Sequence, residues 1–204
     1  MSDVGLIEYD KLEDGTKLMY KNENLTSVEC SFPNLKNGTE MFCDCSSLTD
    51  VNISDLSKLE NGNMMFYRVG YKSFNCNLPS LKYGRWMFGH SDDDWRNTST
   101  LISFTGDLSA LVDGRSMFNQ QYKLTNFTTS KLSNLKAGYK MFNRTSLSLD
   151  SIINIVNSLP DINHLDREND LDWTYLLNGE NQMIKKEERG VISINGKLSD
   201  DELI

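Results

Sequence analysis

Few side chains in this sequence have the types and spacing that could do chemistry. The segment from His90 to Trp95 gathers a histidine and three aspartates, Asp92, Asp93 and Asp94. Their carboxylate oxygens are the kind of ligand that Ca²⁺ and Mg²⁺ prefer. Three adjacent aspartates lack the alternating spacing of a calcium-binding loop, however, so a solvated loop is the favoured interpretation. We therefore predict no metal site and no cofactor.

The sequence carries no recognisable catalytic pattern. Its two histidines, His90 and His164, stand near no candidate nucleophile, and G-x-S-x-G, P-loop and H-E-x-x-H sequences are missing. A site built from aspartate or glutamate alone stays open, although nothing singles out one pair. We predict that the protein is not an enzyme.

The four cysteines do not form a known redox or zinc pattern. Cys43 and Cys45 are spaced as C-x-C, where such sites use C-x-x-C. Cys30 and Cys76 hold equivalent places two repeats apart. At about 4.8 Å per repeat they would lie on the order of 10 Å from each other, too far for a disulfide. We predict four reduced thiols.

Charge and hydropathy exclude two classes of partner. With 29 acidic and 21 basic residues the formal net charge is -8, a field that repels phosphate backbones and anionic lipid. No run approaches the roughly 20 apolar residues that span a bilayer, and the start MSDVGLIEYD lacks the regions of a signal peptide. We expect neither nucleic-acid binding nor membrane insertion, and a chain that stays in the cytoplasm or leaves it within a larger particle.

The elements that must position these side chains come from one repeated phrase, L-x-x-G-x-x-M-F. It recurs, with variations, from Leu12, Leu35, Leu59, Leu81, Leu111 and Leu135, at spacings of 23, 24, 22, 30 and 24. A second apolar pair follows each phrase, as in Leu25 and Val28. The apolar residues of the phrase and this second pair are each too few to form a helix. Turn-forming residues separate them. The pattern predicts a mainly β repeat solenoid of about six coils of 22 to 24 residues, with narrow parallel sheets.

Three features of the repeat are expected to have structural roles. The glycine of each phrase is expected either to take a positive φ or to allow a close approach between coils. The Met-Phe pairs are expected to stack as the core. The coil after Leu81 is interrupted, because Phe88 and Leu101 stand 13 positions apart where equivalent pairs stand 5 or 6 apart. We expect a loop on one face there.

After Leu147 the period changes to that of a helix. Leu149, Ile152, Ile153, Val156 and Leu159 are helically spaced, Ser148 or Asp150 could serve as N-cap, and Pro160 as stop. We predict three parts: a solenoid with its N-terminal cap at 1–147, a capping helix at 148–160, and a C-terminal segment at 161–204. The last part is expected to be a small α+β or irregular tail.

Binding residues are sought at the two variable positions between the glycine and Met-Phe. Variation at fixed repeat positions is typical of solvent-facing sites. Several of these side chains are types favoured at interface hot spots, and in register they would form a stripe. Together with two residues of the inserted loop, the candidate partner-binding residues are Met64, Arg85, Trp86, His90, Trp95, Arg115 and Tyr139.

The segment MFCDCSSLTDVNISDLSKLENGNMMF resembles the BspA-type leucine-rich repeat, in which an aromatic residue, a small turn with cysteine, and Ser-Leu precede the next strand. The resemblance covers about residues 12–147. Members of that family are non-catalytic recognition proteins of gut bacteria and their phages, including surface adhesins and tail-associated proteins. It implies a leucine-rich-repeat-like scaffold that binds protein or surface glycan, with no catalytic residues to carry over.

Three functional hypotheses follow. The first is a non-enzymatic binding or structural module of a phage virion, tail-associated, that displays a recognition surface to a virion protein or host surface molecule. The second is a fragment of a bacterial cell-surface adhesin. The third is an intracellular enzyme or inhibitor that uses the acidic C-terminal segment, for which paired carboxylates with shifted pKa values would be the sign.

Overall fold

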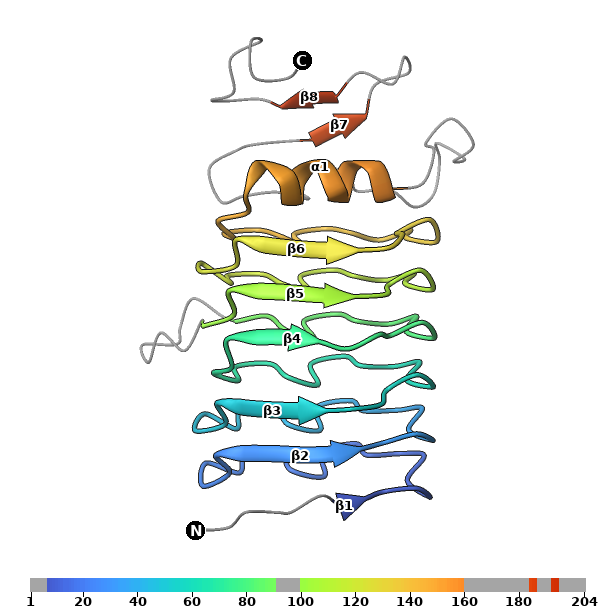
Figure 1. Cartoon of the computed structure of the whole chain (residues 1–204), viewed down its shortest axis with the longest axis vertical. Coiled ribbons are helices and arrows are strands. Elements are labelled where there is room, and N and C mark those ends of the chain that lie inside the picture. The colour runs from blue at the N-terminus through green and yellow to red at the C-terminus, as the bar shows by residue number, and fades with distance from the viewer. Residues whose placement is uncertain (1–6, 91–99, 160–183, 187–191, 195–204) are drawn as a thin grey trace.

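The computed structural model describes residues 7–90, 100–159, 184–186 and 192–194 (Figure 1). Figure 1 shows the short strands of residues 7–129 stacked in chain order, with a helix packed beyond them. The elements are β1 (Ile7–Glu8), β2 (Ser27–Ser31), β3 (Asp50–Ile53), β4 (Ser73–Asn75), β5 (Ser103–Gly106), β6 (Asn126–Thr129), α1 (Leu149–Ser158), β7 (Ile184–Lys186) and β8 (Ile192–Ile194).

The strands form at the second apolar pair of each repeat. They lie in two parallel sheets of three strands, ordered β1-β2-β3 and β4-β5-β6. Equivalent residues face each other across neighbouring strands, so Val28 pairs with Val51, and Phe104 pairs with Phe127. The short parallel strands expected from the sequence are therefore present. A separate antiparallel pair joins β7 and β8.

The prediction of a six-coil β solenoid is wrong. The strands do not join into one continuous sheet, because β3 and β4 are edge strands of two separate sheets. Near this break Gly70 donates its N–H to the carbonyl of Leu48 at 3.1 Å, outside either strand. The break falls in the shortest repeat, of 22 residues between Leu59 and Leu81. The apolar pattern at Tyr71 and Phe74 gives no sign of it.

The L-x-x-G-x-x-M-F phrases are not strands but successive tight turns joined from one repeat to the next. In the Leu35 repeat, Met41 donates its N–H to Gly38 at 3.1 Å and closes a turn. Gly38 and Glu40 donate to the carbonyls of Asn61 and Asn63 in the next repeat, at 2.8 and 3.0 Å. Isolated parallel bridges run on through Asp14, Asn37, Asn61, Tyr83, Asp113 and Ala137.

The glycines allow neighbouring repeats to approach closely, and the positive φ values belong to other residues. A Cβ on Gly62 would stand 2.9 Å from Sδ of Met87 in the following repeat, closer than real contacts allow. The left-handed residue is instead the second after each glycine, as at the third place of a type II turn. These residues are Lys17 (58°), Glu40 (54°), Met64 (55°), Trp86 (57°), Ser116 (55°) and Lys140 (55°).

The Met-Phe pairs form the core, as predicted. Each methionine and phenylalanine from Met41–Phe42 to Met141–Phe142 is at most 1% exposed. The rings of Phe66 and Phe88 stack at 5.7 Å, and those of Phe118 and Phe142 at 5.4 Å. A second ring column on the strands packs against the first. In the first repeat the equivalent of the methionine is Leu18, which is 45% exposed because no earlier repeat covers it.

The predicted helix is confirmed as α1, and it covers the open edge of β6. Ser148 is the N-cap, and its side chain accepts the N–H of Ser151 at 3.3 Å. The Ser151 hydroxyl accepts the N–H of Phe127 at 2.9 Å, so it replaces a strand partner. Asn154 does the same for Thr129, accepting its N–H at 3.1 Å and donating to its carbonyl at 3.3 Å.

The predicted C-terminal segment, 161–204, lies outside the described residues except for β7 and β8. The same holds for Asp92, Asp93 and Asp94 of the inserted loop. No helix within the described ranges combines the length and the hydropathy that a bilayer-spanning segment requires.

Candidate functional site

An open groove of about 380 Å³ crosses the turn face of three consecutive repeats. Its volume is at the lower end of the range for small-ligand pockets. The lining residues come mainly from the variable pairs of the Leu35, Leu59 and Leu81 repeats: Thr39, Glu40, Asn63, Met64, Tyr67, Arg85 and Trp86. The stacking of the turns therefore converts sequence variation at one repeat position into a local surface.

Three lining residues, Glu40, Met64 and Trp86, have the left-handed backbone of the turn. This conformation costs a residue with a Cβ roughly 1 to 2 kcal/mol, and glycine avoids the cost. Bulky side chains at such a place are uncommon. The geometry directs side chains of the variable pairs to the groove at the expense of local strain.

The aromatic wall of the groove is held by contacts between its side chains. The rings of Trp86 and Tyr67 meet edge to face, with centroids 5.7 Å apart and planes at 89°. The guanidinium of Arg68 lies 5.0 Å from the centre of the Tyr67 ring and forms an ion pair with Asp44 at 3.3 Å. A Cβ on Gly89 would stand 2.7 Å from Cε3 of Trp86, so the missing side chain makes room for the indole.

Several polar side chains of the groove already have a partner within the chain. Glu40 forms an ion pair with Lys17, with 3.4 Å between Oε2 and Nζ. Thr39 donates its hydroxyl to Oδ1 of Asn37 at 2.7 Å. Asn63 uses its Oδ1 to accept the backbone N–H of Arg85 at 2.8 Å, which leaves its amide NH₂ directed elsewhere. No bond from that NH₂ is formed to another described residue.

Arg85 differs from the arginine at the same place in the next repeat. Arg115 forms a bidentate pair with Asp113, at 2.9 Å from Nε to Oδ1 and 2.6 Å from Nη2 to Oδ2. Its hydrogen bond to Asp113 raises the pKa of Arg115. The residue corresponding to Asp113 in the Leu81 repeat is Tyr83, which has no carboxylate. The exposed guanidinium of Arg85 has no ion-pair partner among the described residues.

The structure gathers some of the predicted binding residues and separates others. Met64, Arg85 and Trp86 line the groove, whereas Arg115 and Tyr139 lie in later repeats and do not. His90 is only 3% exposed, so its prediction as a surface contact is wrong. Its backbone N–H donates to Asn119 at 2.9 Å, which holds it in the stack. Trp95 lies outside the described residues.

Sequence reasoning missed four of the lining residues as members of one site. Thr39, Glu40 and Asn63 belong to the variable pairs, so aligning three neighbouring repeats could have found them. Tyr67 directly follows the Met-Phe pair, and no sequence pattern marks that position as a binding position. The equivalent residues in other repeats are as different as Cys43 and Asn119.

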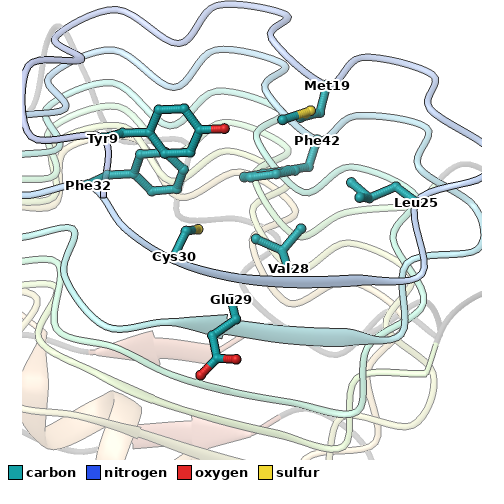
Figure 2. A pocket seen from close by; sticks show the side chains of 8 residues that line it. All are labelled: Tyr9, Met19, Leu25, Val28, Glu29, Cys30, Phe32 and Phe42. Atoms are coloured by element: carbon teal, nitrogen blue, oxygen red, sulfur yellow. The ribbon is translucent and has the colours of Figure 1, made fainter. Parts of the chain in front are cut away.

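A second, smaller cavity of about 20 Å³ lies near β1 (Figure 2). Figure 2 shows the rings of Tyr9, Phe32 and Phe42 around it, with Glu29 pointing away. Tyr9 and Phe32 stack at 5.1 Å. The volume is close to that of one water molecule, and the walls are apolar. It is a packing defect of the core rather than a binding site.

The four cysteines are free thiols in the structure. Burial raises the pKa of Cys30 to about 12. Burial, reinforced by Asp44, raises the pKa of Cys43 to about 12 as well. Because the thiolate is the reactive form, these are structural residues rather than nucleophiles. Within the described residues, no group of three or more His, Cys, Asp or Glu side chains is placed to hold a metal ion.

Comparisons with protein-family models, curated proteins and solved structures find no match to this chain. The proposal of a function therefore starts from the groove on the turn face.

Proposed function

We propose that this chain is a non-enzymatic binding module that recognises its partner through the groove formed by the Leu35, Leu59 and Leu81 repeats. The observation that carries the proposal is the convergence of Met64, Arg85 and Trp86 on one groove. Tryptophan and arginine are enriched among residues that dominate binding energy, and methionine is enriched at interfaces. The groove is preorganised by the contact of Trp86 with Tyr67, which lowers the entropy cost of binding.

The module acts, in this proposal, as a tail-associated protein of a phage virion. Support comes from the resemblance of the segment around Cys43 and Cys45 to BspA-type repeat proteins, which include such proteins. The absence of catalytic motifs in the sequence agrees with a binding role. A place on a bacterial cell surface is the alternative that the same resemblance allows.

The groove is tested with the double variant Met64→Gly and Trp86→Gly. Glycine relieves the left-handed strain of both residues, roughly 1 to 2 kcal/mol each, and this offsets the lost packing. Folding should therefore persist while binding is lost. The matched control is Lys140→Gly, which makes the same backbone change in the Leu135 repeat, outside the groove.

The measurement uses virions purified from cells that carry the gene. Mass spectrometry should find the chain in the particles, and adsorption to host cells should fall at least tenfold with the double variant but not with Lys140→Gly. Recovery of the chain from the cell envelope instead of particles would favour the surface-adhesin alternative. Unchanged adsorption, with the variant present in particles at normal amounts, would remove the groove from the proposal.

A further inference from the structure

Two donor groups of the groove have no partner among the described residues, and they indicate the chemistry of its ligand. Glu40 is paired with Lys17, and Thr39 is bonded to Asn37. The Asn63 oxygen accepts the backbone N–H of Arg85. The Arg85 guanidinium and the Asn63 NH₂ have no acceptor among the described residues. Both donors line the groove together with Trp86. A complementary ligand must bring an acceptor.

The next repeat has an arginine at the same position as Arg85, and a carboxylate of its own turn neutralises it. In the Leu111 repeat, Asp113 stands two residues before Arg115 and holds it in a bidentate pair. In the Leu81 repeat, Tyr83 takes that place, and the tyrosine side chain is 47% exposed. Arg85 therefore keeps a complete donor face of the kind that binds carboxylates in two parallel bonds.

We propose that the groove binds an acidic peptide segment of a protein partner, with one carboxylate on Arg85 and Asn63 and a neighbouring apolar side chain against Trp86 and Met64. The inference rests on the proposed function and names its ligand class. A neutral saccharide fits less well, because it offers no carboxylate to form two parallel bonds with an arginine. Local charge complementarity selects the partner even though the whole chain carries a net charge of -8.

The test titrates the full chain with capped pentapeptides and follows the indole N–H resonance of Trp86 by NMR, assigned with Trp86→Phe. The probes are acetyl-Gly-Phe-Asp-Leu-Gly-amide, its Asn-for-Asp twin, and a glucuronic-acid disaccharide. The Asp peptide should give a saturable shift and bind at least about tenfold more tightly than the Asn peptide. Arg85→Gln should abolish this preference, and Arg115→Gln should leave it intact.

A second variant tests the role of Arg85 without altering any lining residue. Tyr83→Asp places a carboxylate where Asp113 stands relative to Arg115, so Arg85 becomes paired within its own turn. Affinity for the Asp peptide should fall about tenfold, and affinity for the Asn peptide should stay the same. The Trp86 resonance without peptide should remain close to that of the native chain.

Several outcomes would overturn the proposal. They are equal affinity for the two peptides, no effect of Tyr83→Asp, a saturable shift only with the disaccharide, or no shift with any probe. Each concerns the ligand class alone. The virion experiment with Met64→Gly and Trp86→Gly decides independently whether the groove is the recognition surface.

Discussion

Replacing Phe118 by alanine should destabilise the fold by about 3.5 to 5 kcal/mol. The side chain is fully buried, and burying a phenylalanine contributes about 1.5 to 3 kcal/mol. Its ring contacts four other phenylalanines, with centroids 5.0 to 5.4 Å away. At roughly 0.5 kcal/mol or more for each ring pair these contacts add about 2 kcal/mol. The result agrees with the usual loss of about 3 to 5 kcal/mol for Phe→Ala.

The assay is urea unfolding followed by circular dichroism, with the slope against denaturant compared between variants. Leu18→Ala is the control, because Leu18 is 45% exposed, and its loss should stay within about 0.5 kcal/mol. Phe118→Leu keeps most of the volume but loses the ring contacts, so it should cost about 2 kcal/mol, which guards against a variant that does not fold. A loss below about 1 kcal/mol for Phe118→Ala, at an unchanged slope, would refute the stacked-ring core.

Three further predictions use the same assay. Tyr71→Phe should leave stability unchanged or raise it by about 1 to 3 kcal/mol, because the buried hydroxyl has no hydrogen-bond partner among the described residues; a clear loss would reveal a partner. Ser151→Ala should cost about 1 to 3 kcal/mol by orphaning the N–H of Phe127, and a neutral result would contradict that bond. The free energy of unfolding should fall as pH rises from about 9 toward 12, because unfolded cysteines ionise near 8.5 while Cys30 and Cys43 stay protonated to about 12. The double variant Cys30→Ala and Cys43→Ala should reduce that slope, and an unchanged slope would assign it to other groups.

The sequence predicted those features that depend on apolar periodicity. The burial of Met87 and Phe88 and the helix at 149–158 follow from spacing alone, because the free energy of burial rewards any residue that repeats on one face. The break between β3 and β4 could not be predicted in this way. Tyr71 and Phe74 keep the apolar pattern of their neighbours, while strand pairing depends on backbone register in a repeat of 22 residues.

The site was predictable only in part. The variable positions led to Met64, Arg85 and Trp86, but not to the fact that Arg115 is neutralised by Asp113. Hot-spot residue types do not report pairing, which depends on the residue two places earlier. The turn backbone was missed for a related reason. The sequence left open whether each glycine takes a positive φ or allows a close approach. The glycines in fact make room for methionine side chains, and the left-handed conformation falls on larger residues.

The covering of β6 by α1 also protects this edge from strand addition by another molecule. An incoming strand from another molecule would need the N–H groups of Phe127 and Thr129 for its carbonyls. The side chains of Ser151 and Asn154 occupy both, and a helix presents no further row of backbone groups to copy. The edge of β6 therefore cannot pair with a strand of another molecule. Fibril growth by strand addition is blocked at that end of the stack.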